Sequence, residues 1–423
     1  MLAATVRVTR DLDAAEEAVQ DAYVQALQAW GPDGVPFRPS AWLTTVARRN
    51  ALNAMRRRRT LQAKLPLLLE REEVGMPEAD GEAIPDDRLR LIFTCCHPAL
   101  AEEARIALTL RLVCGLATAD IAHAFLVPEA TMAARLTRAK KKISAARIPY
   151  VVPSEGDLSE RVDAVLTVIH LLYAAGHTAH SGADLVRDDL TERALDLARM
   201  LRLLLPADRE VTGLLALLLV QHARRATRTD AHGRLLRLRE QDRSAWDRAM
   251  IAEADRLVIA ALTAGPPGRF TLEAAIAALH AQAPDYERTD WPQILTLYDE
   301  LLRIWPSPVV ALNRAVAVSM VHGPKAALAE VESIEQGGRL AGYRYLHAVK
   351  ADLLHRLGRD AEAVQAYRAA LALTGNAAEQ DFLTERIRST GTVAHISGQP
   401  KPVATPRADS PAVRNGPRGC AES

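Results

Sequence analysis

The chain has 423 residues, and only 4% of them are aromatic. Alanine and leucine dominate the composition, which favours helices and excludes an all-β fold. The 53 Lys and Arg residues nearly balance the 52 Asp and Glu residues, so the formal net charge is +1. Any binding to nucleic acid must therefore come from a local cluster of charge. At this length we expect about three domains.

The sequence shows no signal for export or membrane insertion. Its longest apolar run, residues 213–220, is far shorter than the ~18 residues that a membrane-spanning helix needs. The first ten residues also lack the pattern of a secretion signal, so we expect a cytoplasmic protein with no membrane contact. The cysteines lack the spacing of metal ligands, and we interpret them as reduced structural thiols: Cys95, Cys96, Cys114 and Cys420.

The first predicted helix covers residues 13–30. Its apolar side chains recur at helical spacing, and they are Ala15, Ala18, Val19, Ala22, Tyr23, Ala26, Leu27 and Trp30. Asp13, Glu17 and Asp21 follow one another every four residues on the opposite face. Such an acidic ridge either binds a partner or is an ordinary solvated face.

A second predicted helix covers residues 40–59 and ends in a cluster of arginines. One of its faces collects polar and basic side chains, namely Thr45, Arg49, Asn53 and Arg56. Arginines bind phosphates, while Asn and Thr reach base edges, so this face suits a DNA strand. Trp42 could stack on an unpaired base. The alternative is that Trp42 is a core residue and that the arginines only make the helix end soluble.

Residues 117–143 carry the sharpest signal in the chain, the pattern of a helix-turn-helix. A short helix, a turn at Leu126 and Val127, and a second helix opened by Pro128 follow one another. One stripe of the second helix is spaced for burial and holds Met132, Leu136, Ala139 and Ile143. The stripe one residue earlier holds Thr131, Arg135, Arg138 and Lys142. This outer stripe suits the major groove of DNA, and Glu129 could accept from cytosine or favour the helix dipole.

Residues 156–388 read as a succession of amphipathic helices separated by Gly and Pro breaks. Near residues 310–386, small and aromatic residues have the spacing of tetratricopeptide repeats. In one repeat these are Ala351, Ala363, Tyr367 and Ala370, and Ala315, Ala327 and Val331 echo three of them. The alternative is an ordinary antiparallel helical hairpin. Helix pairs 310–334 and 343–373 are the expected groove for a peptide or a partner helix.

These segments, in this order, resemble a bacterial RNA polymerase sigma factor of the extracytoplasmic function class. Residues 15–23 are similar to the region 2 helix that binds the polymerase. Residues 42–48, with the arginines behind them, are similar to the part of region 2 that melts and reads the minus-10 element. Residues 86–148 are similar to region 4, which reads the minus-35 element. The string at 88–100, together with the C-terminal extension, resembles the subgroup that carries a tetratricopeptide-like domain.

The resemblance implies three sets of site residues. The polymerase would be bound by Asp13, Glu17, Gln20 and Asp21. The minus-10 element would be bound by Trp42, Thr45, Arg48, Arg49, Asn53 and Arg56. The minus-35 element would be bound by Glu129, Thr131, Arg135, Arg138 and Lys142. Members of this class usually carry a further helix before Leu12, so region 2 is expected to be short at its N-terminal end.

We therefore predict an all-α protein with two small helical domains at residues 1–62 and 86–148. An acidic linker at 63–85 joins them, because this stretch is rich in Asp, Glu, Gly and Pro. A larger helical domain follows at 156–388. Residues 389–423 hold too few large apolar side chains to offset ordering entropy, and they are predicted to form a disordered tail.

The predicted function is that of a sigma factor, which binds core RNA polymerase and promoter DNA, with a helical C-terminal control domain that has a protein partner. The alternative is a regulator with a single helix-turn-helix and a sensing domain, which leaves the Trp42 helix unexplained. Glycine-rich phosphate loops and nucleophile or metalloprotease motifs are absent, so we expect no enzyme, no cofactor and no metal.

Overall fold

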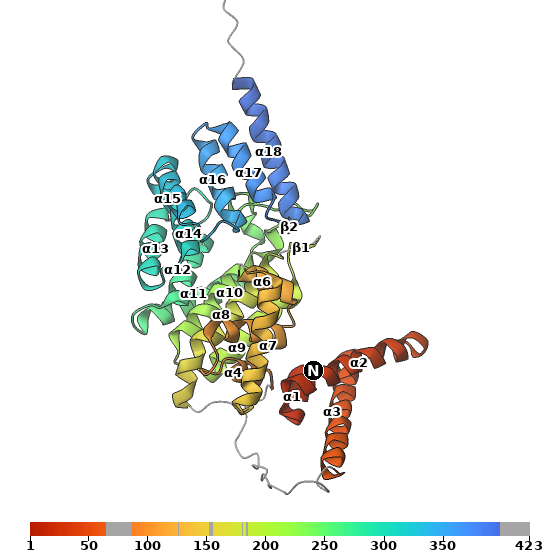
Figure 1. The fold of residues 1–423 in the computed structure, drawn as a ribbon. Helices are drawn as coiled ribbons and strands as arrows, with labels where there is room; N and C mark the ends of the chain where they lie inside the picture. Colours follow the sequence, from red (N-terminus) through yellow and green to blue (C-terminus); the bar gives the residue numbers. More distant parts are fainter. Residues whose placement is uncertain (65–86, 126, 152–154, 180, 183–184, 398–423) are drawn as a thin grey trace, which may run out of the picture.

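The computed structural model describes residues 1–64, 87–125, 127–151, 155–179, 181–182 and 185–397. Most of these residues lie in helices (Figure 1), which confirms the predicted all-α class. Most of the predicted linker at 63–85 lies outside the described residues, as do Leu126 and Cys420. None of the described helices has the length and hydrophobicity that a bilayer crossing requires.

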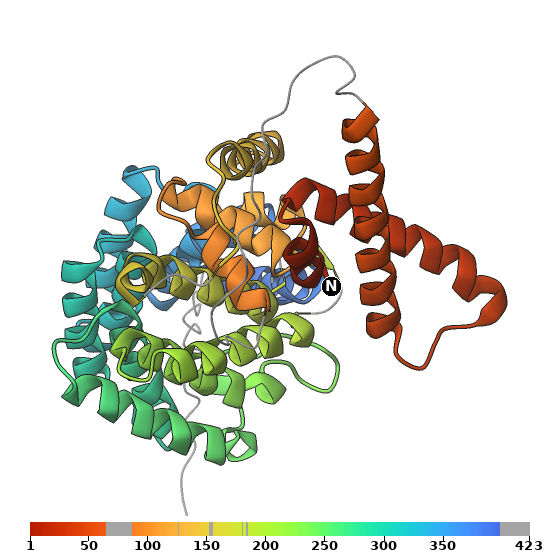
Figure 2. The same ribbon diagram turned by 90° about the horizontal axis from the view of Figure 1, so that it is seen from below.

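The N-terminal part consists of α1 (Leu2–Thr9), α2 (Leu12–Asp33) and α3 (Pro39–Lys64). Helix α2 begins where the Asp11 carboxylate accepts a hydrogen bond from the backbone N–H of Ala14, at 2.9 Å. It is followed by Gly34, whose φ of 77° suits a residue without a Cβ. Helices α2 and α3 cross and project from one side of the molecule (Figure 2). A small core holds them together, and it comprises Ala22, Ala26, Leu43, Val46 and Ala47.

Four helices follow: α4 (Asp87–Cys95), α5 (Glu102–Leu112), α6 (Thr118–Ala124) and α7 (Glu129–Ala145). Helices α6 and α7 form the predicted helix-turn-helix. The predicted inner stripe is confirmed, because Met132, Leu136, Ala139 and Ile143 are buried. Pro128 caps α7 as the residue before the helix, and not as its first helical residue as predicted. Three of the cysteines are buried free thiols, and burial raises the pKa of Cys96 to about 11.

The C-terminal extension begins with α8 (Glu155–His177), α9 (Asp188–Leu204), α10 (Arg209–Ala223), α11 (Arg248–Thr263) and α12 (Arg269–Gln282). A segment between α10 and α11 carries three short 3-10 helices, η2 (Arg225–Thr227), η3 (Leu238–Glu240) and η4 (Arg243–Ala245). One hydrophobic cluster runs from α5 and α7 into α8 and α10, and includes Leu108, Leu136, Ile169 and Leu214. The helix-turn-helix and the extension therefore share a core.

A second core holds the helices that follow: α13 (Trp291–Ile304), α14 (Pro308–Val321), α15 (Pro324–Gln336), α16 (Arg344–Arg356), α17 (Asp360–Leu371) and α18 (Ala377–Ser397). Each of these helices packs on the next (Figure 1). The small and aromatic residues of the predicted repeats are all buried, namely Ala315, Ala327, Val331, Ala351, Ala363, Tyr367 and Ala370. Because any close helical hairpin buries such residues, the tetratricopeptide relationship stays a prediction.

The predicted start of the disordered tail at Ser389 is wrong, because helix α18 covers this residue. It continues to Ser397, past Ser389, and Thr390 is buried within it. Composition alone suggested disorder from Ser389, but α18, which packs along α17, stays helical beyond this residue. At its other end, strands β1 (Ser181–Gly182) and β2 (Gly375–Asn376) pair in parallel and join the loop after α8 to the start of α18.

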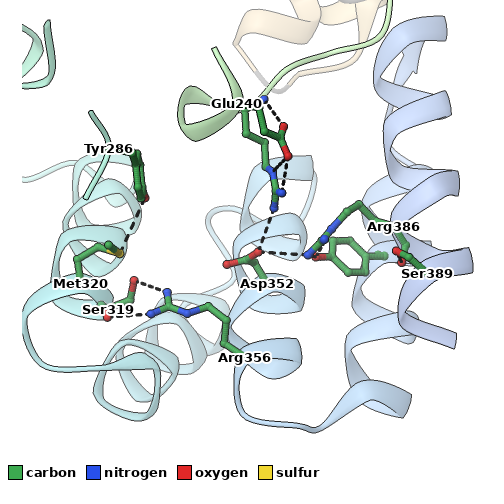
Figure 3. A network of polar contacts seen from close by, with 10 residues as sticks. Glu240, Tyr286, Ser319, Met320, Asp352, Arg356, Arg386 and Ser389 are labelled. Atoms are coloured by element: carbon green, nitrogen blue, oxygen red, sulfur yellow. Dashed lines mark hydrogen bonds and ion pairs between the residues drawn. The ribbon is translucent and has the colours of Figure 1, made fainter. Parts of the chain in front are cut away.

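A polar network fills one side of the last helices (Figure 3). Arg237, the residue before η3, pairs with Glu240 at 2.5 Å and lies 3.9 Å from Asp352 on α16. Asp352 also accepts from Arg386 on α18 at 3.4 Å, and Arg386 donates to the Tyr367 hydroxyl at 2.9 Å. The chain's own η3 segment thus occupies this side of the helix pairs that were expected to form a groove for a partner.

Candidate nucleic-acid and polymerase interface

Helix α3 carries a depression in the protein surface. Its lining residues are Thr45, Arg48, Arg49, Leu52, Asn53 and Arg56, and all of them are exposed. The Thr45 hydroxyl donates to the carbonyl of Ala41 at 3.0 Å, so its oxygen can still accept a hydrogen bond. Guanidinium groups around an amide and a hydroxyl can bind a phosphate backbone and a base edge together. The fold thus brings together every predicted minus-10 residue except Trp42.

Trp42 lies in a different environment. It is partly buried and packs edge-to-face on Trp30, with ring centroids 5.5 Å apart. Both indoles pack against the small core between α2 and α3. Stacking of Trp42 on a base stays a prediction, and it would require this ring pair to separate.

The outer face of α7 presents most of the predicted minus-35 residues to solvent. Glu129, Thr131, Arg138 and Lys142 are exposed. Arg135 differs, because it is partly buried and pairs with Glu103 on α5 at 3.7 Å. Its guanidinium also lies 5.9 Å from the centroid of the Phe125 ring. Arg135 is therefore held by its own domain, whereas Arg138 is exposed and has no ion-pair partner in the part of the chain that the structure describes.

The acidic ridge of α2 lies on the surface. Asp13, Glu17, Gln20 and Asp21 are all exposed. Part of the predicted apolar face is exposed as well, since Tyr23 keeps 52% of its surface and Leu27 keeps 81%. The helical period placed these two side chains beside the core, but no described helix covers that side of α2. The ridge and this apolar strip together give α2 a surface suited to a protein partner.

An ion pair that the sequence did not predict links α2 to α7. The Lys140 ammonium lies 2.6 Å from the Glu16 carboxylate and 3.1 Å from the Asp13 carboxylate. Burial of Lys140 disfavours its charge, but the hydrogen bonds to Glu16 and Asp13 outweigh this and raise its pKa. Helical spacing could not predict this pair, because no local signal relates Lys140 to Glu16, which lies 124 positions earlier.

Three segments of the chain match known protein families. Residues 2–60 match Sigma-70 region 2 and residues 90–143 match Sigma-70 region 4. The chain belongs to the sigma-70 family. It is a sigma factor of the extracytoplasmic function type with a C-terminal extension, and it binds RNA polymerase and recognises promoter elements. Within the extension, residues 161–262 match a family of unknown function (DUF6596).

The sigma factor also has a relative that is similar over nearly its full length. An "Uncharacterized protein R00370" of Rhizobium meliloti (strain 1021) is 44% identical over 408 residues, which cover 95% of each chain. The similarity therefore includes the C-terminal extension as well as the two sigma regions.

In this sigma factor, region 2 corresponds to α1–α3 and region 4 to α4–α7. Tyr150, just after region 4, connects the two. Its hydroxyl lies 2.7 Å from the Asp87 carbonyl at the start of α4 and 3.1 Å from the Ala3 carbonyl in α1, and donates to either one. Together with Lys140, this contact holds regions 2 and 4 against each other.

Proposed function

We propose that the sigma factor opens and reads promoters through two separate basic faces. The depression on α3 binds the minus-10 strand, with Arg48, Arg49 and Arg56 on phosphates and Asn53 on a base edge. The observation that carries this assignment is that Thr45, Asn53 and the three arginines converge on one exposed surface. The outer face of α7, with Arg138 and Lys142, binds the minus-35 duplex.

Replacement of Asn53 by Ala tests the first face. The variant should bind promoter duplex normally through region 4 but open it more slowly, because the base contact in the melted strand is lost. Permanganate reactivity of promoter thymines with reconstituted holoenzyme measures the opening. Asn50→Ala is the matched control, since Asn50 lies on the same helix but is only partly exposed. Its amide oxygen accepts a hydrogen bond from the amide nitrogen of Gln25 at 3.4 Å. Unchanged thymine reactivity in Asn53→Ala would contradict the assignment.

The α2 surface is proposed to bind core polymerase. Asp13, Glu17, Gln20 and Asp21 supply the polar contacts, and the exposed Tyr23 and Leu27 add apolar area. This arrangement of a central apolar strip with charges beside it is typical of protein interfaces. Because Lys140 engages Asp13, polymerase binding at this end of α2 competes with the contact between regions 2 and 4.

The C-terminal extension is proposed to control how region 4 is presented. The shared core of α5, α7, α8 and α10 supports this, because it fixes region 4 on a much larger helical body. Arg161 on α8 donates to the Phe93 carbonyl at 3.1 Å, and Arg193 on α9 donates to the Cys114 carbonyl at 3.3 Å. A partner protein that binds the extension would then act on region 4 through these packed helices.

A regulator with one helix-turn-helix is the weaker alternative, since such a protein needs no Sigma-70 region 2 at residues 2–60. We further propose that the protein has no catalytic activity of its own, because sigma regions act by binding. Its place of action is the cytoplasm, where bacterial polymerase and promoters are found.

A further inference from the structure

A group of cationic side chains lies inside the C-terminal extension, away from both DNA-binding faces. Arg224 and Arg228 follow α10, and Arg243 lies in η4. Burial, followed by the charge of Arg228, lowers the pKa of Arg224 to about 10. Arg224 nevertheless keeps part of its surface in contact with solvent. Arg224 is therefore a deeply placed cation that is not fully sealed from solvent.

Two of these arginines have donors without acceptors. Arg224 Nε and Arg243 Nη2 are shielded from solvent and have no hydrogen-bond partner among the described residues. Both guanidinium groups lie against the ring of Trp246, at 5.7 Å and 4.9 Å from its centroid. The other terminal nitrogen of Arg243 donates hydrogen bonds to the carbonyls of His280 and Ala283, both at 2.6 Å. An aromatic face attracts a cation but does not accept its remaining N–H groups.

Arg228 and Tyr173 extend the group, since the Tyr173 ring stacks on that of His177 and Arg228 binds the His177 carbonyl. Arg228 donates to the His177 carbonyl and, at 2.9 Å, to the Thr178 hydroxyl, so its partners are neutral. Tyr173 is buried, and its hydroxyl has no partner among the described residues. Burial raises the pKa of Tyr173, although Arg228 and Arg224 act in the opposite direction, so the hydroxyl stays a hydrogen-bond donor.

The charge of one carboxylate, Glu379, acts on Arg228, but this carboxylate is already bound elsewhere. Glu379 pairs with Arg344 at 2.8 Å and accepts from Tyr345 at 2.8 Å and from Thr374 at 2.6 Å. Buried cations and donors without acceptors are costly, and native proteins resolve them with a bound ion or water. We propose that Arg224, Arg228 and Tyr173 form a binding site for a small phosphate-type oxyanion.

The chemistry favours a phosphate over a carboxylate. A phosphate carries close to two negative charges and acceptor oxygens that point in several directions, which matches two guanidinium groups and a hydroxyl from different elements. Arginine is the preferred residue for such anions because its planar N–H groups bind two oxygens at once. The site lies apart from both DNA-binding faces, since its residues all belong to the extension.

Titration of the full-length protein with inorganic phosphate tests the site. Sodium chloride keeps the ionic strength constant, and calorimetry with a thermal melt measures binding and stabilisation. Arg224→Lys keeps the charge but loses the planar N–H groups and should weaken phosphate binding by about tenfold. Tyr173→Phe removes only one hydroxyl, keeps the ring packing, and should weaken binding by about threefold or more.

Arg303→Lys is the matched control, because Arg303 is exposed on α13 and pairs with Glu300 at 2.6 Å. It should bind phosphate as the wild type does. A nucleoside monophosphate that binds more tightly than phosphate would support the site and identify a phosphorylated metabolite as its source. Equal phosphate binding by the wild type, Arg224→Lys and Tyr173→Phe, binding of citrate in place of phosphate, or no binding by the wild type would each overturn the proposal.

Discussion

Arg135 and Arg138 stand three residues apart on α7, yet the fold gives them different environments. Arg135 pairs with Glu103 and lies near Phe125, so contact with a base must replace these interactions. Arg138 is exposed and forms no ion pair with any of the described residues. The same residue type on the same helix face can thus serve the fold at one position and DNA at the other.

This contrast leads to a prediction about promoter specificity. Arg138→Ala should relax the minus-35 preference and cost about 1–3 kcal/mol on the preferred sequence, because a bidentate base contact is lost. Lys142→Ala should weaken binding to all sequences alike and reduce the salt dependence, because a phosphate contact releases a counterion. Binding titrations with intact and altered minus-35 duplexes at several salt concentrations distinguish the two effects. If Lys142→Ala changed the preferred sequence and Arg138→Ala did not, Lys142 would read the base and Arg138 would bind the phosphate.

His280 provides a prediction about pH. Burial, with the nearby charges of Arg224 and Arg243, lowers its pKa in the folded protein to about 4. In the unfolded chain the imidazole titrates near ~6.5, so between these pH values the unfolded state binds more protons. The contribution of neutral His280 to the free energy of unfolding is therefore complete above pH ~6.5 and is lost as the pH falls toward 4. The full loss amounts to about 3 kcal/mol.

Denaturant unfolding in phosphate-free buffer at pH 7 and pH 5 measures this effect. His280→Gln should flatten the decrease in stability between these two pH values. His232→Gln is the control, because His232 is exposed. If His280→Gln and the wild type lost the same stability on acidification, another group would be responsible.

At the scale of the elements, helices α10 and α12 pack very closely on each other. Gly213 on α10 faces α12, and a Cβ there would lie 2.6 Å from the backbone nitrogen of Thr271. The side chain of Glu210 strengthens the same contact, since it accepts from the N–H of Phe270 at 2.7 Å and from the Thr271 hydroxyl at 2.6 Å. The Glu210 carboxylate thus caps α12 from α10.

Gly213→Ala should therefore destabilise the extension by about 1–3 kcal/mol, because the backbone of α12 must move away. Gly31→Ala on α2 is a matched helix substitution where an added Cβ meets nothing within 4 Å. It should leave stability unchanged or raise it by up to about 1 kcal/mol through helix propensity. Thermal unfolding of both variants tests the pair, and equal stability of Gly213→Ala and wild type would mean that the two helices can separate at little cost.

At the scale of the whole molecule, regions 2 and 4 hold each other in the free protein. Lys140→Glu places a carboxylate beside Asp13 and Glu16, so the contact between α2 and α7 should open. The variant should bind core polymerase more tightly than the wild type, since the end of α2 no longer has to be released. Solution scattering should show a larger radius of gyration for the free variant.

Lys141→Glu is the control, because it makes the same change of charge at an exposed neighbour. Both substitutions replace a positive charge in region 4 by a negative one, so the DNA affinities of the two variants should fall together. A polymerase affinity that is the same in Lys140→Glu and Lys141→Glu would show that the contact with α2 does not limit binding.

The sequence by itself determined the helices, the helix-turn-helix and the two basic faces. Periodicity and capping depend on residues within one helix, so the buried stripe of Met132 and Leu136 and the α3 face with Asn53 follow from spacing alone. Composition misjudged residues 389–397, which continue the helix α18 that packs on α17.

Only the tertiary structure decided how these parts meet. The sharing of a core between region 4 and the extension, the pairing of Lys140 with Glu16, and the retention of Arg135 by Glu103 all join separate elements. A charged residue on a helix face can find a partner on DNA, on polymerase or on another helix. Spacing within its own helix is the same in each case, so the choice depends on which surface the fold brings within hydrogen-bonding distance.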